Sequence, residues 1–357
     1  MSNIDKPFFF YSENFPKTLK RIKATLVFST YQAGKLIFIS SLNGKTIIKY
    51  AKGFKRPMGI AVDKNKMKLA VASRTSINVF ASDKVLALSY PEKKNRYDQL
   101  FIPQVKYYTG YLDTHEIEFG IDNEIYFINT MFSCISKVSA DKHFELYWKP
   151  DFITELLPED RCHLNGMAMR NGKPAFVTMF DTTNTSFGWK KTPKETGLLM
   201  EVETGRVLLD QLAMPHSPVY FDDKIYFLLS GTGEIKCYDL KSEKVTLISK
   251  IDSFLRGLVV HDDFLIVGTS KLREETTTFK GLPFSAEDSY CGIYILNRTT
   301  GKPMGGISYT DNIREIFSLK LLFDVQVPGI LVENDELHDK SIMADTNLNF
   351  WIKQKKQ

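Results

Sequence analysis

The sequence lacks the features of a membrane protein or a disulfide-stabilised secreted protein. No apolar run approaches the ~20 residues that a membrane-spanning helix needs, and Met1–Lys23 shows no signal-peptide core. Only 4 cysteines occur in 357 residues, and none has the Cys-x-x-Cys spacing of a zinc knuckle or redox motif. We therefore expect a cytoplasmic protein with reduced thiols and no membrane partner.

A strong charge of one sign is also missing. The net charge of +5 is small for a chain of 357 residues, so we expect no nucleic-acid partner. The chain is 43% hydrophobic and 13% aromatic, which is enough for a sizeable core. A β-rich chain of this length can fold as one domain.

What the sequence does contain is a short segment that recurs at intervals of roughly 40–60 residues. Each copy has a polar tip, a small or turn-forming residue and a short apolar strand. The six copies are Arg56–Val62, Asp113–Phe119, Arg161–Met169, Pro215–Phe221, Leu255–Val260 and Arg314–Leu319.

Runs of β-branched and aromatic residues follow five of these copies and are separated by hairpin-type turns, which predicts four-stranded units. The first predicted unit comprises Gly59–Asp63, Met67–Ser73, Ser76–Ala81 and Lys84–Tyr90. The sixth copy, with its strand at Ile316–Leu322, lacks following strands, and the N-terminus offers Thr25–Thr30, Lys35–Ser41 and Lys45–Tyr50 instead. The fold class predicted is all-β: a six-bladed β-propeller (25–328) closed by both chain ends, with an N-terminal arm (1–24) and a C-terminal tail (329–357).

Three connections are too long to be simple turns, namely Pro91–Leu112, Phe180–Thr196 and Ser270–Tyr290. Long loops in a compact domain are often functional. The strand count places all three on the face where the polar tips lie, so we expect them to form a rim around the mouth of the central channel.

Three of the six tips carry a histidine: His115, His163 and His216. Three neutral imidazoles with an open fourth position are typical of a catalytic site for a divalent metal, zinc or similar. Glu315 is a candidate carboxylate ligand or general base across the channel. Two alternatives stay open: the histidines bond backbone carbonyls in the turns, or a histidine acts without metal as an acid or base beside arginines. Cys162 beside His163 is a weaker candidate nucleophile, because adjacent residues on an extended segment point in opposite directions.

Arginines near a channel mouth favour an anionic ligand, because a guanidinium binds carboxylate or phosphate with two hydrogen bonds. The alternative is that they pair with carboxylates and hold the ring together. We predict His163, Arg256 and Glu315 as catalytic residues. The predicted substrate-binding residues are Tyr31, Gln32, Arg56, Arg74, Asn165, Thr232, Arg256 and Lys271.

Several longer motifs resemble those of a family of bacterial conserved hypothetical proteins with a domain of unknown function. They are Tyr31-Gln32-Ala33-Gly34-Lys35-Leu36, Arg56-Pro57-Met58-Gly59, Asn129–Cys134, Pro158–Gly166, Met214-Pro215-His216-Ser217-Pro218 and Ser230-Gly231-Thr232-Gly233-Glu234. The resemblance implies a propeller and supplies no reaction. The family's usual Asp-x-His-Asp is changed here, because Glu116 follows His115. The predicted architecture is also similar to gluconolactonases and virginiamycin-inactivating lyases, but a shared fold does not imply a shared function.

The leading functional hypothesis is an enzyme of the hydrolase, lyase or isomerase type that acts on a small anionic, peptide or sugar substrate. The alternative is a non-catalytic module that binds a ligand or a protein at the same mouth. An assembly role is favoured only if Phe180–Thr196 and Ser270–Tyr290 form an interface away from it.

Overall fold

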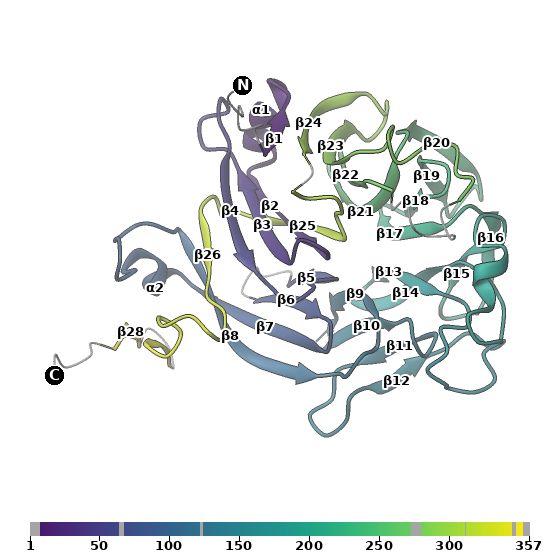
Figure 1. The fold of residues 1–357 in the computed structure, drawn as a ribbon, viewed down its shortest axis with the longest axis horizontal. Coiled ribbons are helices and arrows are strands. Elements are labelled where there is room, and N and C mark those ends of the chain that lie inside the picture. Colours follow the sequence, from purple (N-terminus) through teal and green to yellow (C-terminus); the bar gives the residue numbers. More distant parts are fainter. Residues whose placement is uncertain are drawn as a thin grey trace, which may run out of the picture.

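The computed structural model of the chain describes residues 8–63, 68–121, 124–272, 280–310, 312–344 and 348–352. Its described residues form six sheets arranged as blades around a central axis, so the predicted six-bladed β-propeller is confirmed (Figure 1). Met67 in the first predicted unit, Met1–Pro7 of the arm and Lys353–Gln357 of the tail lie outside the described residues.

Blades 2, 3 and 4 are four-stranded antiparallel sheets in chain order. Blade 2 has strands β9 (Thr114–Phe119), β10 (Ile125–Asn129), β11 (Cys134–Lys137) and β12 (Glu145–Trp148). Blade 3 has β13 (Leu164–Arg170), β14 (Lys173–Met179), β15 (Gly197–Glu201) and β16 (Val207–Leu212). Blade 4 has β17 (Pro215–Phe221), β18 (Lys224–Leu229), β19 (Glu234–Asp239) and β20 (Val245–Lys250).

Blades 1 and 5 each gain an outer fifth strand from a chain end. Blade 1 contains β5 (Ile60–Val62), β6 (Lys68–Ser73), β7 (Ser76–Asp83), β8 (Gln99–Tyr108) and β26 (Pro328–Ile330). Blade 5 contains β21 (Phe254–His261), β22 (Phe264–Ser270), β23 (Cys291–Asn297), β24 (Pro303–Tyr309) and β1 (Phe9–Tyr11). The added strands cover backbone groups that would otherwise form exposed sheet edges.

Blade 6 joins the two ends of the chain, as predicted. Its inner strand β25 (Ser318–Phe323) pairs antiparallel with β2 (Ala24–Thr30), which continues into β3 (Lys35–Ser40) and β4 (Ile48–Gly53). Figure 1 shows the late strand β25 beside the early strand β2. Pairing strands from both ends closes the ring of sheets.

The prediction of a strand at Lys84–Tyr90 is wrong. Residues Lys84–Leu88 form the short helix α2, and the fourth strand of blade 1 is β8, inside the region predicted as a long loop. Asp83 starts the helix, because its side chain accepts a hydrogen bond from the backbone N–H of Leu86 at 2.6 Å. Pro103 lies within β8 at an irregularity in the register with β7 and beyond the residues that pair with β26, a place where a strand tolerates proline.

This correction also moves the first predicted rim loop. The segment 84–98 now connects the third and fourth strands of blade 1, and such connections lie on the face opposite the one that carries the polar tips. Pro91–Leu112 is therefore not a third mouth loop.

The chain ends pack on the propeller. Helix α1 (Asn14–Ile22) buries Phe15, Leu19 and Ile22 in the cluster shared with blades 5 and 6. Residues of the C-terminal segment, including Leu331 and Trp351, pack with α2. Strands β27 (Ser341–Met343) and β28 (Asn349–Trp351) form a hairpin there.

The core lies between neighbouring blades, and hydroxyl groups tie the blades together near the mouth. Thr130 donates to the carbonyl oxygen of Leu164 at 2.7 Å, and Ser230 donates to that of Leu255 at 2.5 Å. Each bond joins the turn after a second strand to the inner strand of the next blade, so the positions of the tips are set by their neighbours. Among the described residues no helix is long and apolar enough to cross a membrane.

Candidate functional site at the channel mouth

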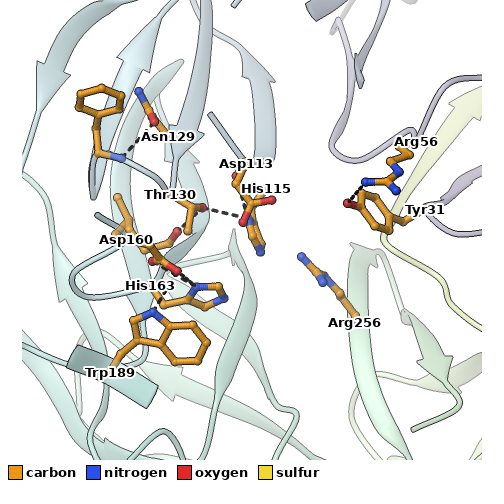
Figure 2. Close-up of polar contacts among 12 residues, drawn as sticks. Tyr31, Arg56, Asp113, His115, Asn129, Thr130, Asp160, His163, Trp189 and Arg256 are labelled. Carbon is orange, nitrogen blue, oxygen red and sulfur yellow. Dashed lines mark hydrogen bonds and ion pairs between the residues drawn. The ribbon is translucent and has the colours of Figure 1, made fainter. Parts of the chain in front are cut away.

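Many of the predicted site residues line one cavity at the channel mouth, which we call the mouth cavity. It has a volume of about 320 Å³. The predicted residues that line it are Tyr31, His115, His163, His216, Arg256, Lys271 and Glu315. In Figure 2 the imidazoles of His115 and His163 and the guanidinium of Arg256 point toward the same central space.

The strand register shows that the three histidines do not occupy matching positions. Three residues pair with the last residues of the second strands in blades 2 to 4, namely Thr114, Leu164 and Pro215. In blade 5 Leu255 pairs with Thr269, and its carbonyl accepts from Ser230 as that of Leu164 accepts from Thr130. The residues that follow them are therefore the matched set: His115, Asn165, His216 and Arg256. His163 lies two residues before Asn165, at the corner that precedes the strand, where it has a φ of 48°. The sequence-based assumption that all three were equivalent is wrong.

These four residues surround a narrow constriction below the mouth cavity, which we call the neck. His115, Asn165, His216 and Arg256 line a void of about 10 Å³ together with Phe317. Below the neck lies a wider cavity of about 610 Å³, whose lining includes Glu116, Glu118 and Lys320. The neck thus separates the mouth from the opposite face of the propeller.

His115 and His216 are held in the same way. Nδ1 of His115 lies 2.9 Å from the carbonyl oxygen of Asp113, and Nδ1 of His216 lies 3.1 Å from that of Met214. Asp113 and Met214 have positive φ angles of 51° and 53°, which turn these carbonyls back toward the rings. Because a carbonyl oxygen only accepts, Nδ1 carries the proton in both rings.

Both rings are neutral. Burial lowers the pKa of His115 to about 3, although the neighbouring carboxylate of Asp113 raises it. Burial also lowers the pKa of His216 well below the usual value, and the charge of Arg256 lowers it further. A neutral ring protonated at Nδ1 has a bare lone pair on Nε2.

His163 differs, because its partner is a carboxylate. Nδ1 of His163 lies 3.0 Å from Oδ2 of Asp160, which also accepts a hydrogen bond from the indole N–H of Trp189 at 2.9 Å (Figure 2). The Trp189 ring covers the imidazole, with their centroids 4.1 Å apart, and Phe180 contacts it from a centroid distance of 4.6 Å. Asp160 therefore fixes the orientation of His163, and the two aromatic rings restrict its movement.

Arg256 faces the histidines from blade 5. Its guanidinium carbon lies 3.5 Å from the centroid of the Phe317 ring, and its Nη1 lies 3.9 Å from a carboxylate oxygen of Glu315. Stacking on Phe317 holds the guanidinium plane beside the cavity.

The remaining predicted residues lie outside the mouth cavity. Nη1 of Arg56 donates to the hydroxyl of Tyr31 at 3.4 Å, and the Arg74 guanidinium lies 5.6 Å from the Tyr111 ring centroid, so both arginines stand beside aromatic residues that line it. Gln32 is exposed, and Thr232 donates to Glu234 at 2.8 Å. Neither of these two lines the mouth cavity.

The long insertions of blades 3 and 5 meet over the site. Trp189, in the short 3-10 helix Gly188–Lys191, packs with Phe180, Phe254 and Phe284 in one apolar cluster. The ammonium group of Lys194 also donates to the carbonyl oxygen of Lys280 at 2.8 Å. The two insertions therefore form part of the mouth.

The arrangement does not supply a set of metal ligands. Within the part of the chain that the structure describes, no group of three or more His, Cys, Asp or Glu side chains is arranged to hold a metal ion. In blade 3 the matched position holds Asn165. His163 comes from the corner before it, where it is bonded to Asp160 and its ring centroid lies 5.0 Å from that of His115.

Two important contacts were missed from the sequence. Asp160 lies three residues before His163, and only this spacing hinted at a pair. The role of Trp189 in holding Asp160 had no sequence signal, because 29 residues separate them. Cys162 is fully buried and burial raises its pKa to about 12, which agrees with packing and not with a nucleophile.

Comparison with solved structures shows the same fold. A chain from the crystal structure of a nidogen/laminin complex aligns with a TM-score of 0.54 and 12% identity, covering 84% of this chain and 99% of that one. A protein of unknown function from Bacteroides caccae aligns with a TM-score of 0.51 and 10% identity, covering 84% and 98%. A virginiamycin B lyase from Staphylococcus aureus has a TM-score of only 0.41 at 12% identity, covering 80% and 76%, so it supports no argument about chemistry.

Sequence comparison gives the family but no activity. No curated protein matches the chain. The family model described as "Domain of unknown function (DUF4915)" matches residues 13–331. This match covers almost the whole propeller, and the chain therefore belongs to the DUF4915 family.

Proposed function

We propose that the mouth cavity is an active site for a small anionic substrate and that His163, oriented by Asp160, is its general acid–base. The observation that carries this proposal is the His163–Asp160 pair, with 3.0 Å between Nδ1 and Oδ2, in a cavity that also contains Arg256. A carboxylate behind an imidazole fixes its tautomer and leaves Nε2 for the reacting group.

The cations at the mouth suit an anionic substrate. Arg256 and Lys271 line the mouth cavity, and Arg56 stands at its edge beside Tyr31. Arg256 is only 14% exposed, so its charge acts in a region of reduced dielectric. Glu315 beside it offsets part of that charge and restricts its orientation.

The chemistry supported is proton transfer beside a bound anion. His163 removes a proton from the substrate or from a water, and Arg256 holds a carboxylate or phosphate group next to it. Hydrolysis, elimination and isomerisation all include such a step. A cavity of about 320 Å³ accepts a small molecule and excludes a folded partner.

A substrate screen tests the proposal directly. A collection of small carboxylates and phosphates is incubated with the protein, and turnover is followed by mass spectrometry. For a compound that reacts, His163→Gln should lower kcat by about 100-fold or more, and Asp160→Asn should lower it by a smaller factor, with little change in KM. The exposed His143→Gln is the matched control and should not change kcat.

A different outcome would be that anions bind without turnover and that an Arg256→Met variant loses this binding. That outcome would show a non-catalytic binding module instead of an enzyme. Turnover that survives His163→Gln unchanged would contradict the assignment of the general base.

A divalent metal is a separate prediction from the sequence, and metal analysis tests it. In favour, Nδ1 of each mouth histidine is bonded to a carbonyl or carboxylate, as is usual for histidines that bind metal through Nε2. Against it stands the absence of a three-ligand group among the described residues. We expect less than one equivalent of metal in protein purified without a histidine tag; one equivalent of zinc that is lost in His163→Ala would restore the metal mechanism.

The sequence-based expectations of a cytoplasmic location and of no nucleic-acid or membrane partner are retained in this proposal. They rest on composition, and cell fractionation tests the first of them.

A further inference from the structure

We infer that the neck binds one hydroxyl oxygen of the substrate, so that the substrate is a small hydroxylated anion. This inference rests on the proposed function, because it assumes that the mouth cavity holds an anion. The inference identifies the chemical group of the substrate that enters the channel below that anion.

The neck presents two buried acceptors. His115 is 8% exposed and His216 is 3% exposed, and both line the mouth cavity and the neck. Their Nδ1 atoms are bonded to carbonyl oxygens, so their Nε2 atoms carry lone pairs. The described residues give neither Nε2 atom a hydrogen-bond donor, and the lowered pKa of both histidines keeps the rings neutral.

The neck also presents donors. Oδ1 of Asn165 accepts a hydrogen bond from the hydroxyl of Thr178 at 2.8 Å, which orients the amide so that Nδ2 is the free end. Asn165 is 4% exposed, and its Nδ2 is one of two fully buried side-chain polar atoms without a partner in the described part of the chain. Arg256 adds the donors of its guanidinium at the matched position in blade 5.

This pattern selects the chemistry of the occupant. A carboxylate oxygen only accepts, so it leaves the two imidazole lone pairs unsatisfied. An ammonium group only donates, so it leaves Asn165 unsatisfied and repels Arg256. A hydroxyl oxygen accepts from Asn165 and donates its one proton to one of the two imidazoles, and a void of about 10 Å³ is close to the size that one oxygen needs.

Water donates to both imidazoles and a substrate hydroxyl donates to one of them, and the oxygen of either accepts from Asn165. A water in the free protein satisfies the neck, and a substrate that carries a hydroxyl below its anionic group replaces it. A site built to hydrogen-bond a hydroxyl discriminates strongly against the analogue that lacks it, because the buried polar groups then lose their partner.

Calorimetric titration with butanoate and its 2-, 3- and 4-hydroxy derivatives tests the inference, because the four probes share charge and chain length. At least one hydroxy derivative should bind about tenfold or more tightly than butanoate. His216→Asn keeps a donor near the position of Nδ1 and removes Nε2, so it should reduce this ratio to below about threefold. His216→Gln places an amide near the position of Nε2 and should retain more of the ratio.

Equal binding of all four probes would overturn the inference and leave the anion site intact. If none of the four binds and inorganic phosphate does not bind either, the proposed function itself fails. Nitrogen NMR of the wild-type protein is an independent check that needs no variant to fold. Both His115 and His216 should be neutral and protonated at Nδ1 at pH 7, and a proton on either Nε2 would contradict the inference.

Discussion

At the scale of single residues, the neck depends on the direction in which two imidazoles are turned. His115 and His216 each lie two residues after a residue with positive φ, whose carbonyl oxygen accepts a hydrogen bond from Nδ1. Each Nδ1 also lies beside a hydroxyl, that of Thr130 or Ser230, which donates to a carbonyl oxygen of the next blade. The hydroxyl proton is committed to a carbonyl, so the hydroxyl oxygen is free to accept from Nδ1–H. The same bonds that join the blades therefore fix the tautomer of each ring.

The buried neutral histidines predict sensitivity to acid. Their folded-state pKa values lie below the unfolded value of about 6.5, so the unfolded chain gains protons first as the pH falls, and stability is lost below pH 6.5. Each ring contributes a slope of about 1.4 kcal/mol per pH unit. His216→Asn should reduce the slope of unfolding free energy between pH 6 and pH 4 by about this amount.

Urea unfolding at several pH values measures the effect, with the exposed His143→Asn as control. Burial raises the pKa of Glu116 to about 7, so this carboxyl stabilises the folded protein as the pH falls, which is opposite to the effect of the histidines. Both variants keep Glu116, so its contribution cancels when their slopes are compared. An unchanged slope in His216→Asn would show that the ring is not neutral in the folded protein.

At the scale of secondary-structure elements, insertions shape both faces of the ring. The insertions of blades 3 and 5 place Trp189 and Phe284 in one cluster over the mouth. The insertion of blade 1 carries α2 and packs with the C-terminal segment, where the side chain of Asn349 donates to Asp83 at 2.5 Å. One carboxylate therefore both starts a helix and fixes the hairpin β27–β28.

Asp83→Ala should lower the unfolding free energy by about 1–3 kcal/mol, since it removes a helix cap and leaves the Asn349 amide without its acceptor. Asp83→Asn is the matched variant and should cost less, because an asparagine also caps a helix. Chemical unfolding measures both, and equal losses in the two variants would contradict the capping role.

At the scale of the whole molecule, closure of the ring has a second support besides the pairing of β25 with β2. Lys320, on the inner strand of blade 6, bonds the carboxylate of Glu118 on the inner strand of blade 2. Blade 1 lies between them, so this contact links blades that are not neighbours. The side chains of Lys320 and Glu118 are 19% and 20% exposed, because they line the cavity on the opposite face.

Lys320→Met should destabilise the protein by about 2 kcal/mol, because Glu118 and Glu116 would then face each other without a cation. The double variant Lys320→Met/Glu118→Gln should recover about half of that loss. Thermal and urea unfolding of the wild-type protein, Lys320→Met, Glu118→Gln and the double variant completes a double-mutant cycle. Additive effects of the two substitutions would show that the ion pair does not support closure.

The sequence by itself determined the fold and the general place of the site. Six recurring segments, with β-branched and aromatic runs separated by hairpin-type turns, were enough to predict the blades. The lone inner strand at Ile316–Leu322 was enough to predict closure by Thr25–Thr30. Local chemistry misled at Lys84–Tyr90, where an apolar run capped by Asp83 forms a helix and the fourth strand of blade 1 is β8 instead.

Only the tertiary structure decided how the site is built. Whether a tip side chain enters the neck depends on strand register, and a shift of one residue turns a side chain to the other face. In blade 3 Leu164 pairs with the end of the second strand, as Thr114 and Pro215 do in blades 2 and 4, so Asn165, and not His163, is level with His115 and His216. The pairing of Asp160 with His163 beneath Trp189 depends on how a long insertion folds back over the mouth, which no local pattern in the sequence specifies.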